Sequence, residues 1–133
     1  MATSWPASAD LETLDAVVVG AGIYGIDTAY CLIKELPQLK FMVFEARGNI
    51  EGTWVLYRYP GVRSDSDIST LGFSWHPWPI DRFLATGDEI LEYLTAAVSE
   101  HHLDRYIRFY HRVLSADWST EHQPWMLSIE HHN

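Results

Sequence analysis

Three glycines near the start of the chain have the spacing of a phosphate-binding turn. Gly20, Gly22 and Gly25 fit the pattern G-x-G-x-x-G and directly follow an apolar run at 16–19. In such a turn the first glycine allows a tight bend, and the second lets the backbone approach a pyrophosphate. The third lets the following helix pack on the strand, and that helix points its N-terminal N–H groups at the phosphates. The glycines therefore predict a dinucleotide site.

A carboxylate twenty positions after the last of these glycines belongs to the same pattern. Glu45 ends the second apolar run, 41–45. An acid at this place would accept hydrogen bonds from the hydroxyls of an adenosine ribose. Its charge would repel a 2′-phosphate, although Arg47 could soften that repulsion, so the site suits FAD or NAD better than NADP. A βαβ unit that binds nothing is the alternative.

Hydrophobic periodicity predicts the strands and the helix on which these residues lie. The run 16–19 predicts a strand buried on both faces, because its β-branched residues show no polar alternation. A helix follows, and Pro37 ends it. Its apolar residues recur at helical spacing: Ile23, Ile26, Tyr30 and Ile33. Strand, turn, helix, strand and acid together form a βαβ unit of about 30 residues.

The stretch from 46 to 86 has little periodicity but many aromatic residues, which predicts an ordered, ligand-covering segment with short helical turns. Asp88 is expected to cap a helix beyond it. The apolar face of that helix is Ile90, Leu91, Leu94, Ala97 and Val98. Three short strands are expected after it, at 106–113, 114–119 and 125–130.

These elements predict an α/β fold, a partial Rossmann-like, three-layer arrangement of the FAD/NAD(P)-binding kind. The chain supplies only one further parallel strand beside the first, and its last two strands predict the start of an antiparallel β-excursion. We expect residues 1–14 to form a disordered N-terminal tail. Residues 15–133 would be the N-terminal portion of an FAD-binding Rossmann-like domain that is truncated, or that a partner completes.

Composition excludes several classes of function. The 133 residues carry a formal charge of −9 and no basic stripe, which argues against a nucleic-acid partner. No stretch has the length of a transmembrane segment. The single cysteine, Cys31, is expected to be a small buried hydrophobic residue, and its isolation predicts a reduced, cytoplasmic location. Four of the histidines form two adjacent pairs in the sequence. Adjacent residues do not share one face of a helix or strand, so no metal site is predicted.

The middle of the chain resembles a known family. Three segments carry the likeness: Glu51-Gly-Thr-Trp54, the run 58–67 with its Y-P-G-x-R-x-D motif, and the run 70–78. They look like the N-terminal part of flavin-containing monooxygenases, in particular the Baeyer–Villiger branch that activates thioamide prodrugs. The likeness continues through 90–93, 104–108 and 115–118, and so covers nearly the whole chain from Asp15.

The resemblance implies roles for matching positions. Gly20, Gly22 and Tyr24 would surround the FAD pyrophosphate, and Glu45 the adenosine ribose. Thr53 and Trp54 would lie at the ribityl and phosphate region. Arg63 and Asp65 would lie beside the isoalloxazine, where the nicotinamide of NADPH docks. Val113 would contact the adenine through its backbone. Two positions depart from the family: Tyr24 replaces a small residue, and Glu51 replaces a glycine and brings a carboxylate toward the phosphates.

The resemblance also implies an activity. In the family, FAD and NADPH support the conversion of a ketone to an ester, or the oxygenation of sulfur in a small substrate. The second glycine-rich turn, the histidine–tryptophan linker motif and the active-site arginine of the family have no counterpart in these residues. We therefore expect the FAD-binding segment of an NADPH-dependent flavoprotein monooxygenase, inactive alone. The alternative is a truncated dinucleotide-binding module without catalysis.

Overall fold

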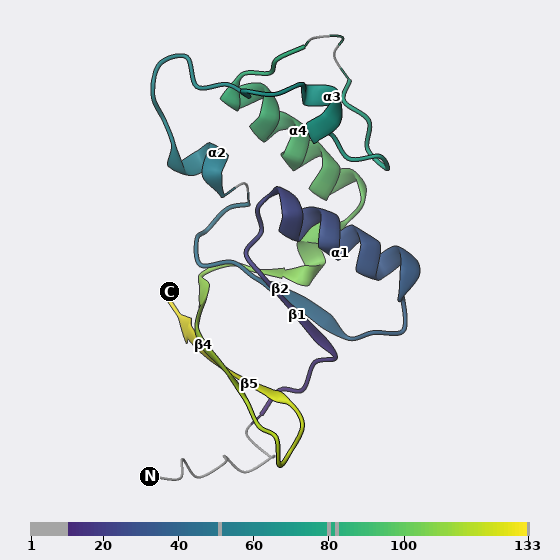
Figure 1. The fold of residues 1–133 in the computed structure, drawn as a ribbon, viewed down its shortest axis with the longest axis vertical. Helices are drawn as coiled ribbons and strands as arrows, with labels where there is room; N and C mark the ends of the chain where they lie inside the picture. The colour runs from purple at the N-terminus through teal and green to yellow at the C-terminus, as the bar shows by residue number, and fades with distance from the viewer. Residues whose placement is uncertain (1–10, 51, 80, 82, 133) are drawn as a thin grey trace.

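A computed structural model describes residues 11–50, 52–79, 81 and 83–132 (Figure 1). The expectation for Glu51 lies outside these residues, as does most of the expected N-terminal tail. Within that tail, Glu12 forms a bidentate ion pair with Arg108, at 2.5 and 2.8 Å between nitrogen and oxygen. The hydrogen bond to Arg108 lowers the pKa of Glu12, and the same bond raises the pKa of Arg108.

The predicted βαβ unit is present. Strand β1 (Ala16–Val19) is followed by helix α1 (Ile23–Glu35) and strand β2 (Phe41–Phe44), and the two strands pair in parallel with Ala16 opposite Phe41. A two-residue strand, β3 (Ile107–Arg108), extends this sheet in the order β1-β2-β3. The mixed α/β, Rossmann-like fold class is confirmed.

The prediction that β1 is buried on both faces is wrong. Its residues are half-buried, and Val19 is 65% exposed. The reason is its place in the sheet: β1 is an edge strand, paired only with β2 among the described residues. In contrast, Phe41, Val43 and Phe44 of the central strand β2 are buried.

The strands at the end of the chain are divided differently from the prediction. The expected strand 106–113 is broken at Tyr110, whose φ of 57° turns the backbone sharply. The short helix η2 (Leu103–Tyr106) and β3 precede this corner, and β4 (His111–Trp118) begins after it. β4 is continuous across 113–115, where its pairing with β5 (Trp125–His131) shifts by a bulge. The antiparallel pair confirms the predicted β-excursion.

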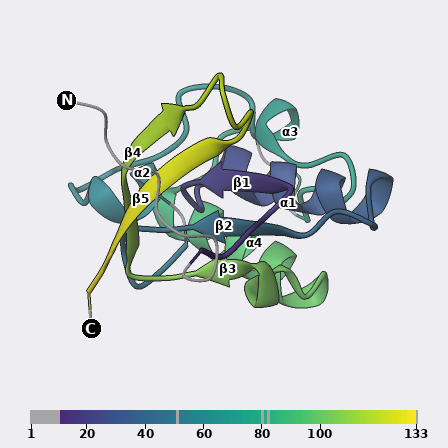
Figure 2. The same cartoon turned by 90° about the horizontal axis from the view of Figure 1, so that it is seen from below.

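The elements form layers around the parallel sheet. Helices α1 and α4 (Gly87–Glu100) lie on one side of it, and the β4–β5 hairpin lies on the other (Figures 1 and 2). The core fills the space between the sheet and the helices. Its most completely buried side chains are Ile26, Val43, Ile68, Ile90, Leu94 and Leu103.

The described residues of the segment 46–86 are ordered and include two short helices, α2 (Thr53–Leu56) and α3 (Ile68–Leu71), as predicted. It is held to the helices by aromatic side chains. The Trp75 ring stacks between Tyr30 of α1 and Phe73, at centroid distances of 3.9 and 4.5 Å. The Tyr93 hydroxyl of α4 accepts a hydrogen bond from the Phe73 N–H (2.7 Å) and donates one to the His76 carbonyl (2.5 Å). Burial raises the pKa of this tyrosine.

A smaller prediction, on the single cysteine, is also wrong. Cys31 is exposed rather than buried, because it lies on the face of α1 that points away from the core. Burial of its sulfur, although slight, and nearby carboxylates raise its thiol pKa, so it is not an activated nucleophile.

Among the described residues, no helix has both the length and the apolar character that a membrane span requires. The cytoplasmic location stays a prediction.

The predicted cap of α4 is displaced by two residues. Thr86, not Asp88, is the N-cap, and it forms a capping box in which its side chain accepts from the Glu89 N–H and the Glu89 carboxylate accepts from the Thr86 N–H. Asp88 lies instead in the first turn, where its charge favours the positive end of the helix.

We expect Thr86→Ala to lower the free energy of unfolding by about 1 kcal/mol, because it removes the acceptor for a helix N–H. Asp88→Ala, the matched control two residues away, should cost less, since only the interaction with the helix dipole is lost. Urea unfolding of both variants measures the difference. Equal losses would contradict the assignment of Thr86 as the cap.

Candidate dinucleotide-binding site

The glycine turn joins β1 to α1 in the conformation that the pattern requires. Gly20 has a φ of 93°, which glycine adopts readily, and its N–H donates to the Phe44 carbonyl (2.8 Å). A side chain on Gly25 would lie 1.9 Å from the Gly20 carbonyl oxygen, so only glycine lets α1 pack this closely. A Cβ on Gly22 meets nothing within 4 Å. The turn thus presents open space at the N-terminus of α1, where Gly22 supplies no side-chain cap.

Glu45 ties the glycine turn to the sheet. Its carboxylate is buried, with one oxygen accepting from the Ala21 N–H (2.8 Å) and the other from the Arg47 N–H (2.9 Å). Its main chain also forms two hydrogen bonds: the Glu45 N–H donates to the Arg108 carbonyl, and the Glu45 carbonyl accepts from the His111 N–H. These contacts place the carboxylate beside the turn, as the sequence pattern requires.

Thr53 and Trp54 are brought to the glycine turn by a close backbone approach. Gly52, with a φ of 47°, lies just before them, and a Cβ there would be 3.5 Å from the Gly22 Cα. Trp54 is half-buried against the core and forms part of the wall of a cavity of about 490 Å³. The rest of the wall comes from 57–62 and from the start of α4 at 86–88 and Leu91.

Arg63 and Asp65 follow the stretch 57–62 in sequence and do not line this cavity. The Arg63 backbone forms a bridge with Thr86, and the neighbouring Ser64 donates its N–H to the Ala85 carbonyl (2.8 Å). Both charged side chains are exposed, and no ion pair joins them. Their charges are therefore not neutralised by each other.

The remaining predicted contacts are those of Tyr24 and Val113. Tyr24 is in the first turn of α1, and its side chain is 86% exposed, so it does not fill the glycine turn. Val113 is half-buried in β4, two residues after His111, whose N–H bonds to the Glu45 carbonyl. The start of β4 thus lies near the acid that the ribose would contact.

Some participants were not predicted from the sequence. The Ala21 and Arg47 N–H groups hold the Glu45 carboxylate, and Gly52 contacts Gly22. The positive φ that a glycine after Glu51 permits is the one signal that could have indicated Gly52. Backbone donors carry no side-chain signature at all. A separate group, His76 with Glu100 and His101, was missed because its members come from distant segments.

A parallel βαβ unit with an open glycine turn and an acid at the end of its second strand defines a Rossmann-like dinucleotide-binding protein. The chain belongs to the NAD(P)-binding Rossmann-like domain family, whose family model matches residues 18–85.

Proteins similar to the chain are flavoprotein monooxygenases. The FAD-containing monooxygenase EthA of Mycobacterium tuberculosis is 46% identical over 121 residues, which are 91% of this chain and 25% of EthA. A structure of cyclohexanone monooxygenase with cyclohexanone bound matches with a TM-score of 0.81 and 33% identity, over 90% of this chain and 24% of that one. An oxidised steroid monooxygenase bound to NADP matches with a TM-score of 0.79 and 34% identity, over 90% and 23%. The chain thus spans about a quarter of the length of these proteins.

Of the three glycines of the turn, Gly22 and Gly25 are expected to respond differently to an added methyl group. Gly25→Ala should lower the free energy of unfolding by about 1–3 kcal/mol, because the Cβ overlaps a backbone oxygen that cannot move aside easily. Gly22→Ala, with open space and a φ of −79°, should leave stability nearly unchanged. Thermal unfolding of the two variants checks this, and equal destabilisation would contradict the described packing of the turn.

Proposed function

We propose that the chain is the FAD-binding segment of an NADPH-dependent flavoprotein monooxygenase of the Baeyer–Villiger type. The observation that carries the proposal is the open glycine turn with the Glu45 carboxylate hydrogen-bonded to it. The likeness to EthA and to cyclohexanone monooxygenase supports the reaction class. The proposed segment runs from Asp15 to Asn133, as the N-terminal portion of the FAD-binding domain.

The residues of the turn fit the adenosine diphosphate half of FAD. The space over Gly20 and Gly22 would admit the pyrophosphate against the N-terminus of α1, which has 13 residues and favours an anion. Each oxygen of Glu45 accepts one backbone N–H and retains capacity for a second bond. The carboxylate can therefore accept ribose hydroxyls without giving up the contacts that hold it.

The other proposed contacts extend from this half toward the flavin. Thr53 and Trp54 would hold the ribityl and phosphate region; the close approach of the preceding Gly52 to Gly22 supports this. Val113 would contact the adenine through its backbone, and Tyr24 would border the pyrophosphate. Trp54 would also exclude water from one side of the flavin.

Arg63 and Asp65 are proposed to receive NADPH beside the flavin. Both are exposed next to the segment that forms the cavity wall, and their opposite charges are available to one ligand. FAD bound here would supply, with NADPH as reductant, the oxygen chemistry that converts a ketone to an ester or oxygenates sulfur. The contribution of this chain would be to bind and orient the two cofactors and to exclude water from one side of the flavin.

A binding module without catalysis is the second candidate. It rests on the same open glycine turn and the same buried carboxylate. The first candidate requires FAD at the glycine turn, whereas the second requires FAD or another nucleotide there and has no turnover.

The binding claim is tested by titrating the 133-residue chain with FAD and, separately, with ADP. Gly22→Val should weaken both by at least about tenfold, because the side chain fills the space of the pyrophosphate. Glu45→Gln should weaken both as well, while circular dichroism reports whether the fold survives. Glu35→Ala, an exposed carboxylate at the far end of α1, is the control and should bind like the parent. Unchanged binding by Gly22→Val would refute the site.

Turnover is tested by supplying FAD, NADPH, O₂ and a simple ketone or sulfide, then following NADPH, hydrogen peroxide and product. We expect the chain alone to give hydrogen peroxide at most and no ester or sulfoxide. A reduced flavin that is exposed to water reacts with O₂ and releases hydrogen peroxide instead of oxygenating a substrate. Arg63→Ala should slow any NADPH oxidation. Stoichiometric oxygenated product would contradict inactivity of the isolated chain and the binding-module alternative together.

A further inference from the structure

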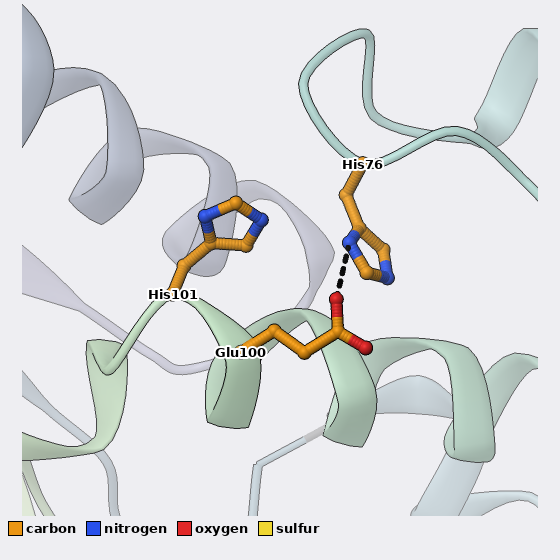
Figure 3. Close-up of side chains that lie close together, drawn as sticks. All are labelled: His76, Glu100 and His101. Atoms are coloured by element: carbon orange, nitrogen blue, oxygen red, sulfur yellow. Dashed lines mark ion pairs between the residues drawn. The ribbon is translucent and has the colours of Figure 1, made fainter.

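Three side chains able to ligate a metal ion meet at the C-terminal end of α4. His76 lies in the loop after α3, Glu100 is the last residue of α4, and His101 is the C-cap. One ligand atom of each lies within 4.8 Å of the other two. Figure 3 shows the Glu100 carboxylate extending from the helix toward the His76 ring, with the His101 ring beside them.

The separations are close to those of a metal site. The His76 Nδ1 lies 3.6 Å from the Glu100 Oε2. Ligand atoms about 2.0–2.1 Å from a tetrahedral Zn²⁺ are roughly 3.4 Å apart. The His76–Glu100 pair already has this spacing, and the widest pair needs to close by roughly 1.4 Å. Glu100 can supply such movement, because its side chain is 66% exposed.

The two imidazoles are held by the surrounding structure. His76 is only 14% exposed, and its backbone carbonyl accepts the hydrogen bond from the Tyr93 hydroxyl. The His101 ring packs edge-on against Tyr30 and Trp75, at centroid distances of 5.1 and 4.9 Å. Fixed ligand orientations reduce the entropy that metal binding costs.

The local charge also favours a cation. The group lies at the C-terminus of a 14-residue helix, which carries a partial negative charge. A cavity of about 510 Å³ beside it is lined by three glutamates, Glu89, Glu92 and Glu100, and by no lysine or arginine among the described residues.

We propose that His76, Glu100 and His101 bind a divalent transition-metal ion of the Zn²⁺ type, with water at the remaining position. Two neutral imidazoles and one carboxylate suit this class of ion, and three protein ligands leave a fourth position open. The site joins the loop at 72–79 to the end of α4, and it is separate from the glycine turn. Without a metal ion, the same His76 and Glu100 side chains make an ion-pair contact.

The test is titration of the full chain with Zn²⁺ by calorimetry and with Co²⁺ by visible absorption, in which tetrahedral coordination gives intense bands. We expect one site. His76→Gln and His101→Gln should each weaken it by at least about tenfold. His102→Gln is the matched control, since it changes the exposed neighbour of His101 outside the group. The double variant His131→Gln/His132→Gln controls for the histidines at the end of the chain.

Two further readouts separate a metal site from the ion pair. Zn²⁺ should raise the Tm of the parent and of His102→Gln, but not that of His76→Gln. Binding should weaken in acid, because a protonated imidazole cannot ligate a metal ion. Glu100→Gln, at an exposed position, repeats the test if His76→Gln fails to fold. Metal binding that survives the His76 and His101 variants, or that only the His131/His132 variant abolishes, would overturn the proposal.

Discussion

The hydrogen bond from the Ala21 N–H to the buried Glu45 carboxylate is the contact on which the site depends. It joins the turn after β1 to the end of β2, two points 24 residues apart. A buried carboxylate is costly unless donors surround it, and Glu45 has two backbone donors. The same residue anchors β3 and β4 through its main chain. The geometry of the turn and the course of the C-terminal strands therefore depend on one side chain and its backbone.

A second constraint comes from backbone contact at glycine. Gly25 brings α1 against the turn, and Gly52 brings α2 against Gly22. Beyond these contacts the segment 46–86 is fixed by aromatic packing rather than by regular structure, with Trp75 stacked between two rings. The Trp75 Nε1 also donates to Asp27 of α1 (2.8 Å). The described part of this segment is thus ordered without long helices or strands.

The sequence predicted those features whose cause is local. The glycine spacing, the acid at position 45 and the helical periodicity of α1 and α4 all identify their elements correctly. Its errors have non-local causes. The burial of β1 depends on which strands flank it, and the break at Tyr110 depends on hydrogen bonds to Arg47 and His132.

The same distinction holds for the candidate sites. Gly20, Gly22 and Glu45 were identified by spacing, whereas Arg63 and Asp65 rest on family resemblance. His76 and His101 are 25 positions apart, and no motif joins them. Their proximity follows from the aromatic stack and from the Tyr93 hydroxyl, which hold the loop over the end of α4.

The turn at 20–25, held by Glu45, is proposed to receive the pyrophosphate of a dinucleotide. The most direct test is to follow backbone amide resonances of the labelled chain by NMR as ADP-ribose is added. We expect saturable shifts at Gly20, Gly22 and Ile23, with little change in the β5 amides. Shifts confined to the hairpin, or no shift at the turn while ligand binds elsewhere, would contradict it.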